Sequence, residues 1–400
     1  MASLTLELAT NKPAQVDKIC LKPFSLEEVK KVKTFHESMW GYYQPTKLVS
    51  LPHLAAWLGV KGIYVKDEST RFGLKAFKAL GGSYAICSYL ADKYSLPLNF
   101  DGIKNANLGT REPGLTFATT TDGNHGRGVA WTAKILGLNA VVYMPKGSTQ
   151  ERVDNIKGEG AQVTVTDYNY DETVRLLAKE AAAKGWVVVQ DTAWEGYTDI
   201  PLKIMQGYTT MVSEALEKIP EKPTHVFVQA GVGSLAAAVQ AVVYNTYGPK
   251  APIFTVLEAE AANCFYRSFS KGAPTAVTGS MSTIMAGLAC GEVNPLAWKI
   301  IQQYSFFALS CHDEVAALGM RILGNPLTGD EAIVSGESGA IGAGVLGLLN
   351  KYHNIKTDLG VTKDSVLLLF NTEGDTSPKH YRDVVWGGLL PCNFGGWDNE

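Results

Sequence analysis

Short apolar runs rich in β-branched residues alternate along this chain with longer segments of helical period. Because the runs are apolar on both faces, they predict buried strands of parallel sheets that are joined by crossover helices. The pattern is typical of an α/β fold, with strands expected at 62–66, 117–121, 140–144, 162–165, 186–189, 225–228, 253–257 and 365–370.

The length of the chain predicts two domains. Its 400 residues exceed the roughly 250 to 300 residues at which a single hydrophobic core stops growing. We expect a small domain at 95–195 and a large, discontinuous domain formed by 1–94 and 196–400. No repeat or low-complexity linker marks these boundaries, so they rest on the placement of the motifs described below.

Composition narrows the classes of partner. Hydrophobic residues make up 46% and charged residues 19% of the chain, the balance of an ordinary soluble protein. A formal charge of -3, from 36 basic and 39 acidic residues, gives no field that would gather nucleic acid or an anionic membrane. No stretch approaches the ~20 apolar residues of a membrane span, and no signal peptide is evident. We therefore expect a cytoplasmic protein with a small-molecule partner.

Cysteine and histidine spacing gives no metal site. The six cysteines lack CxxC spacing, and the seven histidines show no HExxH pattern, so we predict no metal ligands. Buried thiols are the expected state of the cysteines. A bridge between Cys264 and Cys290 and a bound monovalent cation both stay open.

The first segment with candidate chemistry is 68–82, which follows a predicted strand and opens a helix. Lys78 lies in the first turns of that helix, between Phe77 and Leu80. Burial among apolar neighbours should lower the pKa of a lysine toward that of a usable amine. Lys75 is nearer the loop and is expected to be solvated. A lone lysine at a helix start is usually a surface residue, so a functional role for Lys78 depends on the evidence of the other segments.

The second segment, 119–128, is a turn from a strand into a helix that begins near Asn124. Such turns, at the carboxyl ends of parallel strands, are where α/β proteins bind ligands. We expect the glycines at 123, 126 and 128 to let the backbone approach a flat ring or a carboxylate. Asn124 can bond a phenolate oxygen, and the helix amides can hold a carboxylate. Asp122 either caps the helix or serves a substrate.

The third segment, 226–237, is a buried strand, a glycine-containing turn and a helix from about Leu235. This geometry aims unpaired amides and a positive helix end at a phosphate, and Ser234 adds a hydroxyl. The segment also satisfies GxGxxA, and Glu258 ends the next strand, where a ribose-binding acid could sit. A nicotinamide-dependent dehydrogenase therefore stays open at this point.

Two further turns carry polar residues. At 367–378 a core strand runs into a polar turn, where Thr372 or Asn371 could meet a ring nitrogen. At 335–340 a small-residue helix opens, which places Glu337 at a helix N-terminus where it could face a cofactor. Judged alone, each turn is equally well explained as purely structural.

Together and in this order, the segments resemble the fold-type II pyridoxal-phosphate enzymes, from Pro45 to Pro378. Ala76-Phe-Lys78 resembles the family's lysine motif, 123–125 its substrate-carboxylate loop and 231–235 its phosphate cup. The resemblance implies two domains, each a mostly parallel twisted sheet flanked by helices, with pyridoxal phosphate between them, and a homodimer. It implies these cofactor-binding residues: Lys78, Asn124, Gly231, Val232, Gly233, Ser234, Leu235, Glu337 and Thr372.

Two departures from the dehydratases of this family narrow the resemblance. Leu74 stands where they usually have a small residue, and Asp122 replaces the first serine of their Ser-Ser-Gly-Asn-His loop. These residues, with the segment 190–197, resemble the family's ammonia-lyases, which convert 2,3-diaminopropionate to pyruvate and ammonia. A serine or threonine dehydratase, or a β-replacement enzyme of the same fold, remains the alternative.

An acidic pocket suits an amine that arrives as ammonium and leaves as ammonia. We expect Asp122 to attract this group and to remove the α-proton of the D-isomer from the face opposite Lys78, which would serve the L-isomer. Asp191 is a second candidate for the ammonium. The expected catalytic residues are Lys78, Asp122 and Asp191, and the expected substrate contacts are Asp122, Gly123, Asn124, His125 and Asp191.

Overall fold

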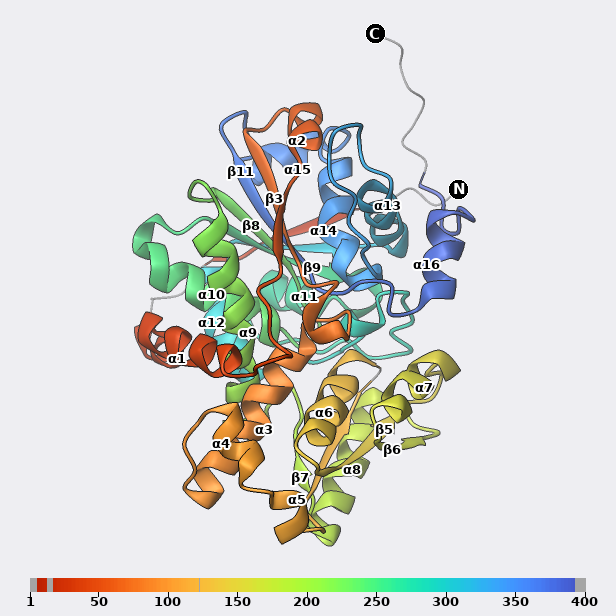
Figure 1. The fold of residues 1–400 in the computed structure, drawn as a ribbon. Helices are drawn as coiled ribbons and strands as arrows, with labels where there is room; N and C mark the ends of the chain where they lie inside the picture. The colour runs from red at the N-terminus through yellow and green to blue at the C-terminus, as the bar shows by residue number, and fades with distance from the viewer. Residues whose placement is uncertain (1–5, 13–16, 122, 393–400) are drawn as a thin grey trace.

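A computed structural model describes residues 6–12, 17–121 and 123–392 and contains two separate sheets (Figure 1). The larger sheet has seven strands, of which the inner five are parallel and the two edge strands are antiparallel. Its order is β1 (Leu6–Thr10), β10 (Phe307–Cys311), β9 (Ile253–Ala259), β8 (His225–Gln229), β11 (Val366–Asn371), β3 (Gly62–Asp67) and β2 (Lys47–Ser50).

The smaller sheet has four parallel strands and lies below the larger one in Figure 1. Its order is β6 (Gln162–Val165), β5 (Asn139–Met144), β4 (Thr116–Thr120) and β7 (Val187–Val188). Helices α6 (Asn124–Ile135) and α7 (Gln150–Gly158) pack on one face of β5, and α8 (Tyr170–Lys184) packs on the other. All four strands fall within the segment 95–195 that was predicted to form the small domain.

Most of the remaining helices surround the larger sheet, whereas α4 and α5 lie at the lower end of Figure 1, nearer the smaller one. The α-helices are α1 (Leu26–Glu37), α2 (Pro52–Leu58), α3 (Lys78–Tyr94), α4 (Phe100–Asn105), α5 (Leu108–Arg111), α9 (Asp199–Lys218), α10 (Ser234–Tyr247), α11 (Cys264–Lys271), α12 (Pro295–Tyr304), α13 (Asp313–Gly324), α14 (Glu337–Leu348), α15 (His353–Asp358) and α16 (Pro378–Val385). The 3-10 helices are η1 (Lys18–Phe24), η2 (Arg71–Gly73), η3 (Gly248–Lys250), η4 (Glu260–Ala262) and η5 (Ala286–Leu288).

The strands of the larger sheet are buried on both faces, which explains their continuous apolar runs. In β11, Leu368 and Phe370 pack into the core formed with α1, α3, α9, α10 and α12. The alternate residues Leu367 and Leu369 pack into the opposite core with α2, α13, α14 and α15. This period of two, with helices on each face, confirms the predicted α/β architecture.

The pattern missed three strands, each for a local reason. Strands β1 and β2 are antiparallel edge strands whose outward residues are polar, so their runs are not continuously apolar. Strand β10 follows α12 after a short turn and is interrupted by Ser310. Among the described residues, no helix has the length and apolar character needed to cross a bilayer.

Helix α3 lies between the two sheets and touches α6 and α9 at glycines. A Cβ built at Gly128 of α6 would lie 2.9 Å from the Cα of Ala79, and one at Gly207 of α9 would lie 2.4 Å from the carbonyl oxygen of Leu80. Because glycine has no side chain, the helix backbones come into direct contact. Lys78, the first residue of α3, is therefore fixed with respect to both sheets.

This packing predicts that Gly207→Ala destabilises the protein. The new methyl group would overlap the Leu80 carbonyl group, a cost of about 1 to 3 kcal/mol in the free energy of unfolding. The matched control is Gly158→Ala, since this helical glycine has nothing within 4 Å of its Cβ position. Urea denaturation should show a lower midpoint for the first variant and an unchanged or higher midpoint for the second. Equal midpoints would contradict the close approach.

Candidate active site

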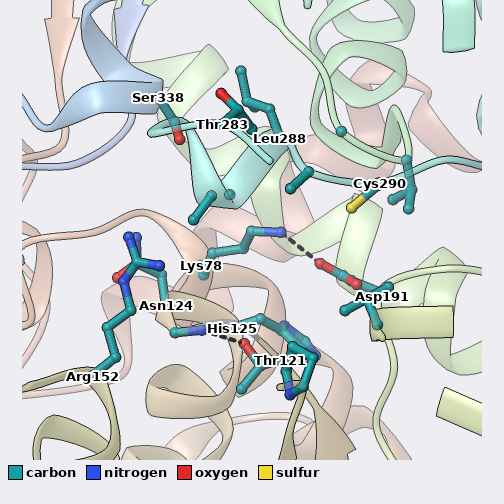
Figure 2. Close-up of a pocket in the computed structure, with 18 of the residues that line it drawn as sticks. Lys78, Thr121, Asn124, His125, Arg152, Asp191, Thr283, Leu288, Cys290 and Ser338 are labelled. Atoms are coloured by element: carbon teal, nitrogen blue, oxygen red, sulfur yellow. Dashed lines mark hydrogen bonds and ion pairs between the residues drawn. The ribbon is translucent and has the colours of Figure 1, made fainter. Parts of the chain in front are cut away.

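A cavity of about 370 Å³ lies where the two sheets face each other, at the carboxyl ends of β4, β5, β7, β8 and β11. Parallel sheets place ligands at this end of their strands. The cavity brings together most of the residues predicted from the sequence, and Figure 2 labels four of them, Lys78, Asn124, His125 and Asp191. Those that line it are Lys78, Gly123, Asn124, His125, Asp191, Gly231, Val232, Gly233, Ser234, Leu235 and Thr372. Asp122 lies outside the described residues.

Lys78 and Asp191 form a buried ion pair in the wall of this cavity (Figure 2). The Nζ atom of Lys78 lies 2.5 Å from Oδ2 of Asp191, and the two side chains are 19% and 7% exposed. Burial lowers the pKa of Lys78, but the carboxylate of Asp191 more than offsets this, so the pKa stands above its ordinary value. The predicted lowering was therefore wrong, because the sequence does not show this carboxylate beside the lysine.

The same pair controls the charge of Asp191. Burial raises the pKa of this carboxyl group, but the positive charge of the Lys78 ammonium group lowers it by more. The resulting pKa is about 2. Both groups are thus ionised at neutral pH. A lysine that is held as an ammonium ion beside a carboxylate is positioned, and it needs only to transfer its proton to become a nucleophile or a base.

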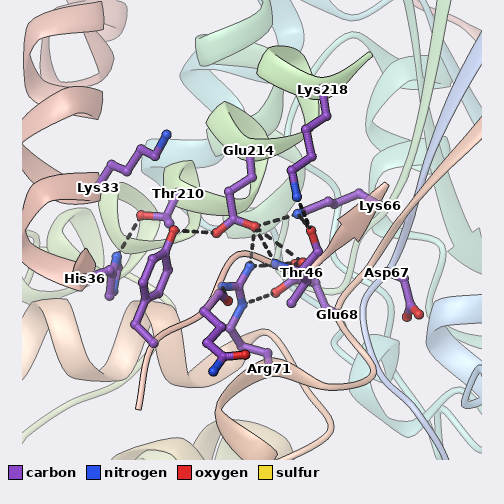
Figure 3. A network of polar contacts seen from close by, with 12 residues as sticks. Lys33, His36, Thr46, Lys66, Asp67, Glu68, Arg71, Thr210, Glu214 and Lys218 are labelled. Atoms are coloured by element: carbon purple, nitrogen blue, oxygen red, sulfur yellow. Dashed lines mark hydrogen bonds and ion pairs between the residues drawn. The ribbon is translucent and has the colours of Figure 1, made fainter. Parts of the chain in front are cut away.

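The loop before Lys78 is held by a buried cluster of four charged side chains (Figure 3). The guanidinium group of Arg71 contacts Glu68 at 2.7 Å and Glu214 at 2.8 Å, and Lys66 contacts Glu214 at 2.5 Å. These residues come from β3, the loop that follows it and α9. The loop then continues through three residues with positive φ, Phe72, Gly73 and Lys75, before α3 begins.

Backbone hydrogen bonds tie the end of this loop to the end of β11. The amide of Phe77 donates to the Thr372 carbonyl at 3.1 Å, and the amide of Gly374 donates to the Lys75 carbonyl at 2.9 Å. The Lys75 side chain is exposed and contacts Asp375 at 2.7 Å, which confirms the prediction that Lys75 is the solvated lysine. Lys78 and Thr372 are thereby held on one continuous wall.

The turn after β4 supplies Gly123, Asn124 and His125 to the cavity. Nε2 of His125 donates to the Val189 carbonyl at 2.7 Å, which makes Nδ1 the acceptor of a neutral ring. Burial lowers the pKa of His125, in agreement with a neutral ring. Nδ1 is buried and has no hydrogen-bond partner within the described part of the chain. A buried acceptor without a partner in a cavity wall indicates a place where a bound ligand would donate a hydrogen bond.

Two of the three predicted ligand-facing glycines have a different role. A Cβ at Gly126 would lie 2.2 Å from the Thr121 side chain, and one at Gly128 would meet α3. Neither residue lines the cavity, so both serve packing and only Gly123 faces the ligand space. The prediction for these two positions was wrong, because a glycine in a helix start also permits close helix packing.

The turn after β8 leads into the start of α10 and lines the cavity. Gly233 has a φ of 92°, and a side chain there would also clash with Phe265. The first amides of α10 have no partner within the helix and carry its positive end. Ser234 donates to the carbonyl of Asp191 at 2.6 Å, so this turn also supports the residue paired with Lys78. The residues at 231–235 fit a phosphate group.

Thr372, and not Asn371, faces the cavity at the end of β11. The hydroxyl oxygen of Thr372 accepts from Nε2 of Gln229 at 2.8 Å, and no described residue accepts the hydroxyl proton. Thr372 is therefore arranged to donate to a ligand acceptor such as an unprotonated ring nitrogen. Asn371 is buried and bonds Ser335 and Asp67 through its amide group.

Glu337 does not line the cavity, although the sequence suggested it as a cofactor contact. Its carboxylate bonds His380 of α16, so it points away from the ligand space. The next residue, Ser338, lines the cavity instead, because a helix turns its side chains by about 100° per residue. Sequence reasoning also missed Arg152, the loop 280–290 and Glu373, although Glu373 follows Thr372 directly.

The dinucleotide alternative fails on Glu258. Both of its carboxylate oxygens accept hydrogen bonds at the start of α11, from the Phe265 amide at 2.8 Å and the Tyr266 amide at 2.7 Å. Glu258 is fully buried and cannot reach a ribose. Within the described residues, no cluster of three His, Cys, Asp or Glu residues could hold a metal ion. Cys264 and Cys290 are thiols and are not joined by a disulfide.

Comparison with known proteins agrees with this geometry. The sequence matches the family described as pyridoxal-phosphate dependent enzymes over residues 39–370. The diaminopropionate ammonia-lyase of Escherichia coli (strain K12) is 52% identical over 396 residues, covering 96% of this chain and 98% of the relative. The chain belongs to the diaminopropionate ammonia-lyases. It is a pyridoxal-phosphate-dependent enzyme, and the dehydrogenase alternative is wrong.

Solved structures show the same fold as this ammonia-lyase. The Escherichia coli diaminopropionate ammonia-lyase in complex with an aminoacrylate-PLP azomethine reaction intermediate superposes with a TM-score of 0.90 at 50% identity, covering 97% of this chain and 98% of that one. Its complex with D-serine gives a TM-score of 0.91 at 49% identity, covering 97% and 99%. The predicted fold-type II architecture is confirmed.

The hydrogen bond from Gln229 predicts that Thr372→Val weakens cofactor binding. Valine keeps the shape but removes the donor, and it leaves one N–H of Gln229 without its acceptor. The affinity for pyridoxal phosphate should fall about tenfold, the result of losing roughly 1.4 kcal/mol. Titration of the apoenzyme followed by tryptophan fluorescence measures this, with Thr372→Ser as the control that keeps the hydroxyl. Equal affinities for valine and serine would show that Thr372 does not contact the cofactor.

Proposed function

We propose that this enzyme removes ammonia from both the D- and L-isomers of 2,3-diaminopropionate and yields pyruvate, with Lys78 and Asp122 as the two bases. The observation that carries the proposal is the Lys78–Asp191 ion pair inside the cavity. The pair places a base, Lys78, beside a carboxylate, Asp191, that can attract the second amino group of the substrate in its ammonium form. The Escherichia coli relatives named above are diaminopropionate ammonia-lyases, one of them in complex with an aminoacrylate-PLP intermediate, which supports the substrate and the release of ammonia.

The cavity residues would hold pyridoxal phosphate at four of its groups. The amides of 231–235 would hold the phosphate, Asn124 the phenolate oxygen, Thr372 the ring nitrogen and Lys78 the aldehyde carbon. Bound in this way, the cofactor supplies an electron-withdrawing ring that acidifies the hydrogen on the α-carbon of the amino acid. The amides of Gly123, Asn124 and His125 would hold the substrate carboxylate at the start of α6.

Proton transfer at the α-carbon would begin the elimination. For the L-isomer, Lys78 first gives up its ammonium proton to solvent and then, as a neutral amine, takes the α-proton. The electron pair left on the α-carbon forms the double bond to the β-carbon. The bond from the β-carbon to the ammonium nitrogen breaks, and this group leaves as neutral ammonia without needing a further proton. The enamine that is released reacts with water to give pyruvate and a second ammonia.

Carboxylates would select the substrate. Asp191 is held in its charged form by Lys78 and so attracts a substrate ammonium group as well as the lysine. Asp122 stands between Thr121 and Gly123, which both line the cavity, and this sequence position supports its role as the second base. Acceptance of a D-isomer is further supported by the complex of the Escherichia coli relative with D-serine.

The family resemblance also supports a homodimer in the cytoplasm. Retention of the cysteines as thiols agrees with a reducing compartment. Sedimentation equilibrium of the holoenzyme tests the oligomeric state, with twice the chain mass expected and a single-chain mass as the contrary result.

Asp122→Asn should separate the two isomers. Asparagine keeps the size of the side chain but cannot take a proton, so we expect turnover of the D-isomer to fall by roughly 100-fold or more. Turnover of the L-isomer should fall far less, because Lys78 serves it. Pyruvate release from each isomer, with serine and threonine as further substrates, gives the measurement. Unchanged D-isomer turnover would show that Asp122 is not its base.

Borohydride reduction should fix the cofactor to Lys78 alone. The structure places this lysine on the cavity, whereas Lys75 is exposed and pairs with Asp375 outside it. Peptide mapping after reduction should therefore find the pyridoxyl group only on the peptide that contains Lys78. Lys75→Ala is the matched control and should be labelled as the wild type is. Label on any other lysine would refute the assignment.

A further inference from the structure

Glu373 is a buried carboxylate of the cavity wall to which the proposed reaction gives no role. It follows Thr372 at the end of β11 and is only 6% exposed. One oxygen accepts a hydrogen bond from the side-chain amide of Asn124. The other accepts from the backbone amide of Ser338 at 3.0 Å. Glu373 therefore joins the starts of two helices, α6 and α14, to the end of β11.

The surroundings of Glu373 leave it little freedom. Its backbone pairs with Ala76 in an isolated bridge, two residues before Lys78. A Cβ at Gly336 would lie 2.8 Å from the Glu373 side chain, so the chain passes closely over it. A carboxylate that is clamped on three sides holds its hydrogen-bond partner in a defined orientation.

The partner, Asn124, is an amide whose two ends differ in hydrogen bonding. Its nitrogen can donate twice and its oxygen can only accept. An ionised carboxylate can only accept, so Glu373 selects the orientation in which the nitrogen of Asn124 faces it. One N–H remains for another acceptor, and a negatively charged oxygen of a ligand is the best acceptor available in such a cavity.

We propose that Glu373 is a positioning residue, which orients the Asn124 amide so that its second N–H is directed at the phenolate oxygen of the cofactor. This inference rests on the proposed function, in which Asn124 contacts that oxygen. The charge on Glu373 then sets the direction of the hydrogen bond. A protonated Glu373 would donate to the amide oxygen of Asn124 and turn the nitrogen away.

Several charged groups act on Glu373 from the elements packed around it. Burial and the charge of Glu337 of α14 raise the pKa of Glu373, Arg152 of α7 opposes both, and the resulting pKa is about 7. His380 of α16 bonds Glu337, and hydrogen bonding to that carboxylate raises the pKa of His380. The Glu373 carboxyl group therefore exchanges a proton in the neutral range.

Glu373→Gln tests the proposal through the visible absorbance of the bound cofactor. In the wild type, we expect the absorbance to change with pH around a midpoint near 7, set by Glu373. Glutamine is neutral at every pH, so this change should vanish in the variant. The kcat for diaminopropionate should also fall about tenfold, because the fixed orientation of Asn124 is lost.

Glu337→Gln is the matched control. It removes a neighbouring negative charge that does not line the cavity and does not bond Asn124. The pH-dependent change in absorbance should persist in this variant and move to lower pH, since Glu337 raises the pKa of Glu373. A merely structural role of Glu373 predicts no such shift in a variant in which Glu373 itself is intact.

Two more variants complete the test. Glu373→Asp keeps the charge but shortens the reach to Asn124, so kcat should fall as it does in the glutamine variant, and a wild-type kcat would overturn the proposal. Asn124→Ala should alter the absorbance at all pH values. If it does so while Glu373→Gln keeps the wild-type pH profile, the role of Glu373 is refuted and that of Asn124 stands. If Asn124→Ala leaves the absorbance unchanged, both the cofactor contact and the positioning role are refuted.

Discussion

The placement of Lys78 depends on a neutral group of four buried charges, Lys66, Glu68, Arg71 and Glu214. Two positive and two negative side chains are withdrawn from water together, and each is tolerated only because the others are present. The group joins β3 to α9 across the first turn of the loop that leads to Lys78 (Figure 3). Removal of any one of these charged side chains would leave an uncompensated charge in the interior, so the four side chains hold the loop as a unit.

The side chains that line the cavity are also held by polar partners, as the loop is. Asp191 pairs with Lys78, Ser234 supports Asp191, Gln229 supports Thr372 and Glu373 holds Asn124. Lys78, Asp191, Asn124 and Thr372 thus each have a partner from another segment of the chain. Such outer partners hold the contacting side chains in place before any ligand arrives, which reduces the entropy lost on binding.

The sequence was informative wherever a property depends on residues that are consecutive in the chain. The strand, turn and helix at 226–237 predict a phosphate site because their geometry is local, and the order of the turns predicts the fold. It was misleading where a property depends on residues far apart. The pKa of Lys78 is set by a carboxylate 113 positions away, and Glu337 is turned away by His380. The limits of the domains remain predictions, although the smaller sheet lies inside the expected segment.

Helix α3 also has a mechanical consequence. It meets α6 on one side and α9 on the other at glycines, so backbone rests on backbone with no layer of side chains between them. Side chains can change rotamer and absorb a displacement, whereas a backbone contact transmits it. Any tilt of the smaller sheet against the larger one would therefore act on the first turn of α3. Lys78 therefore stands at the point where a relative movement of the two sheets would change the shape of the cavity.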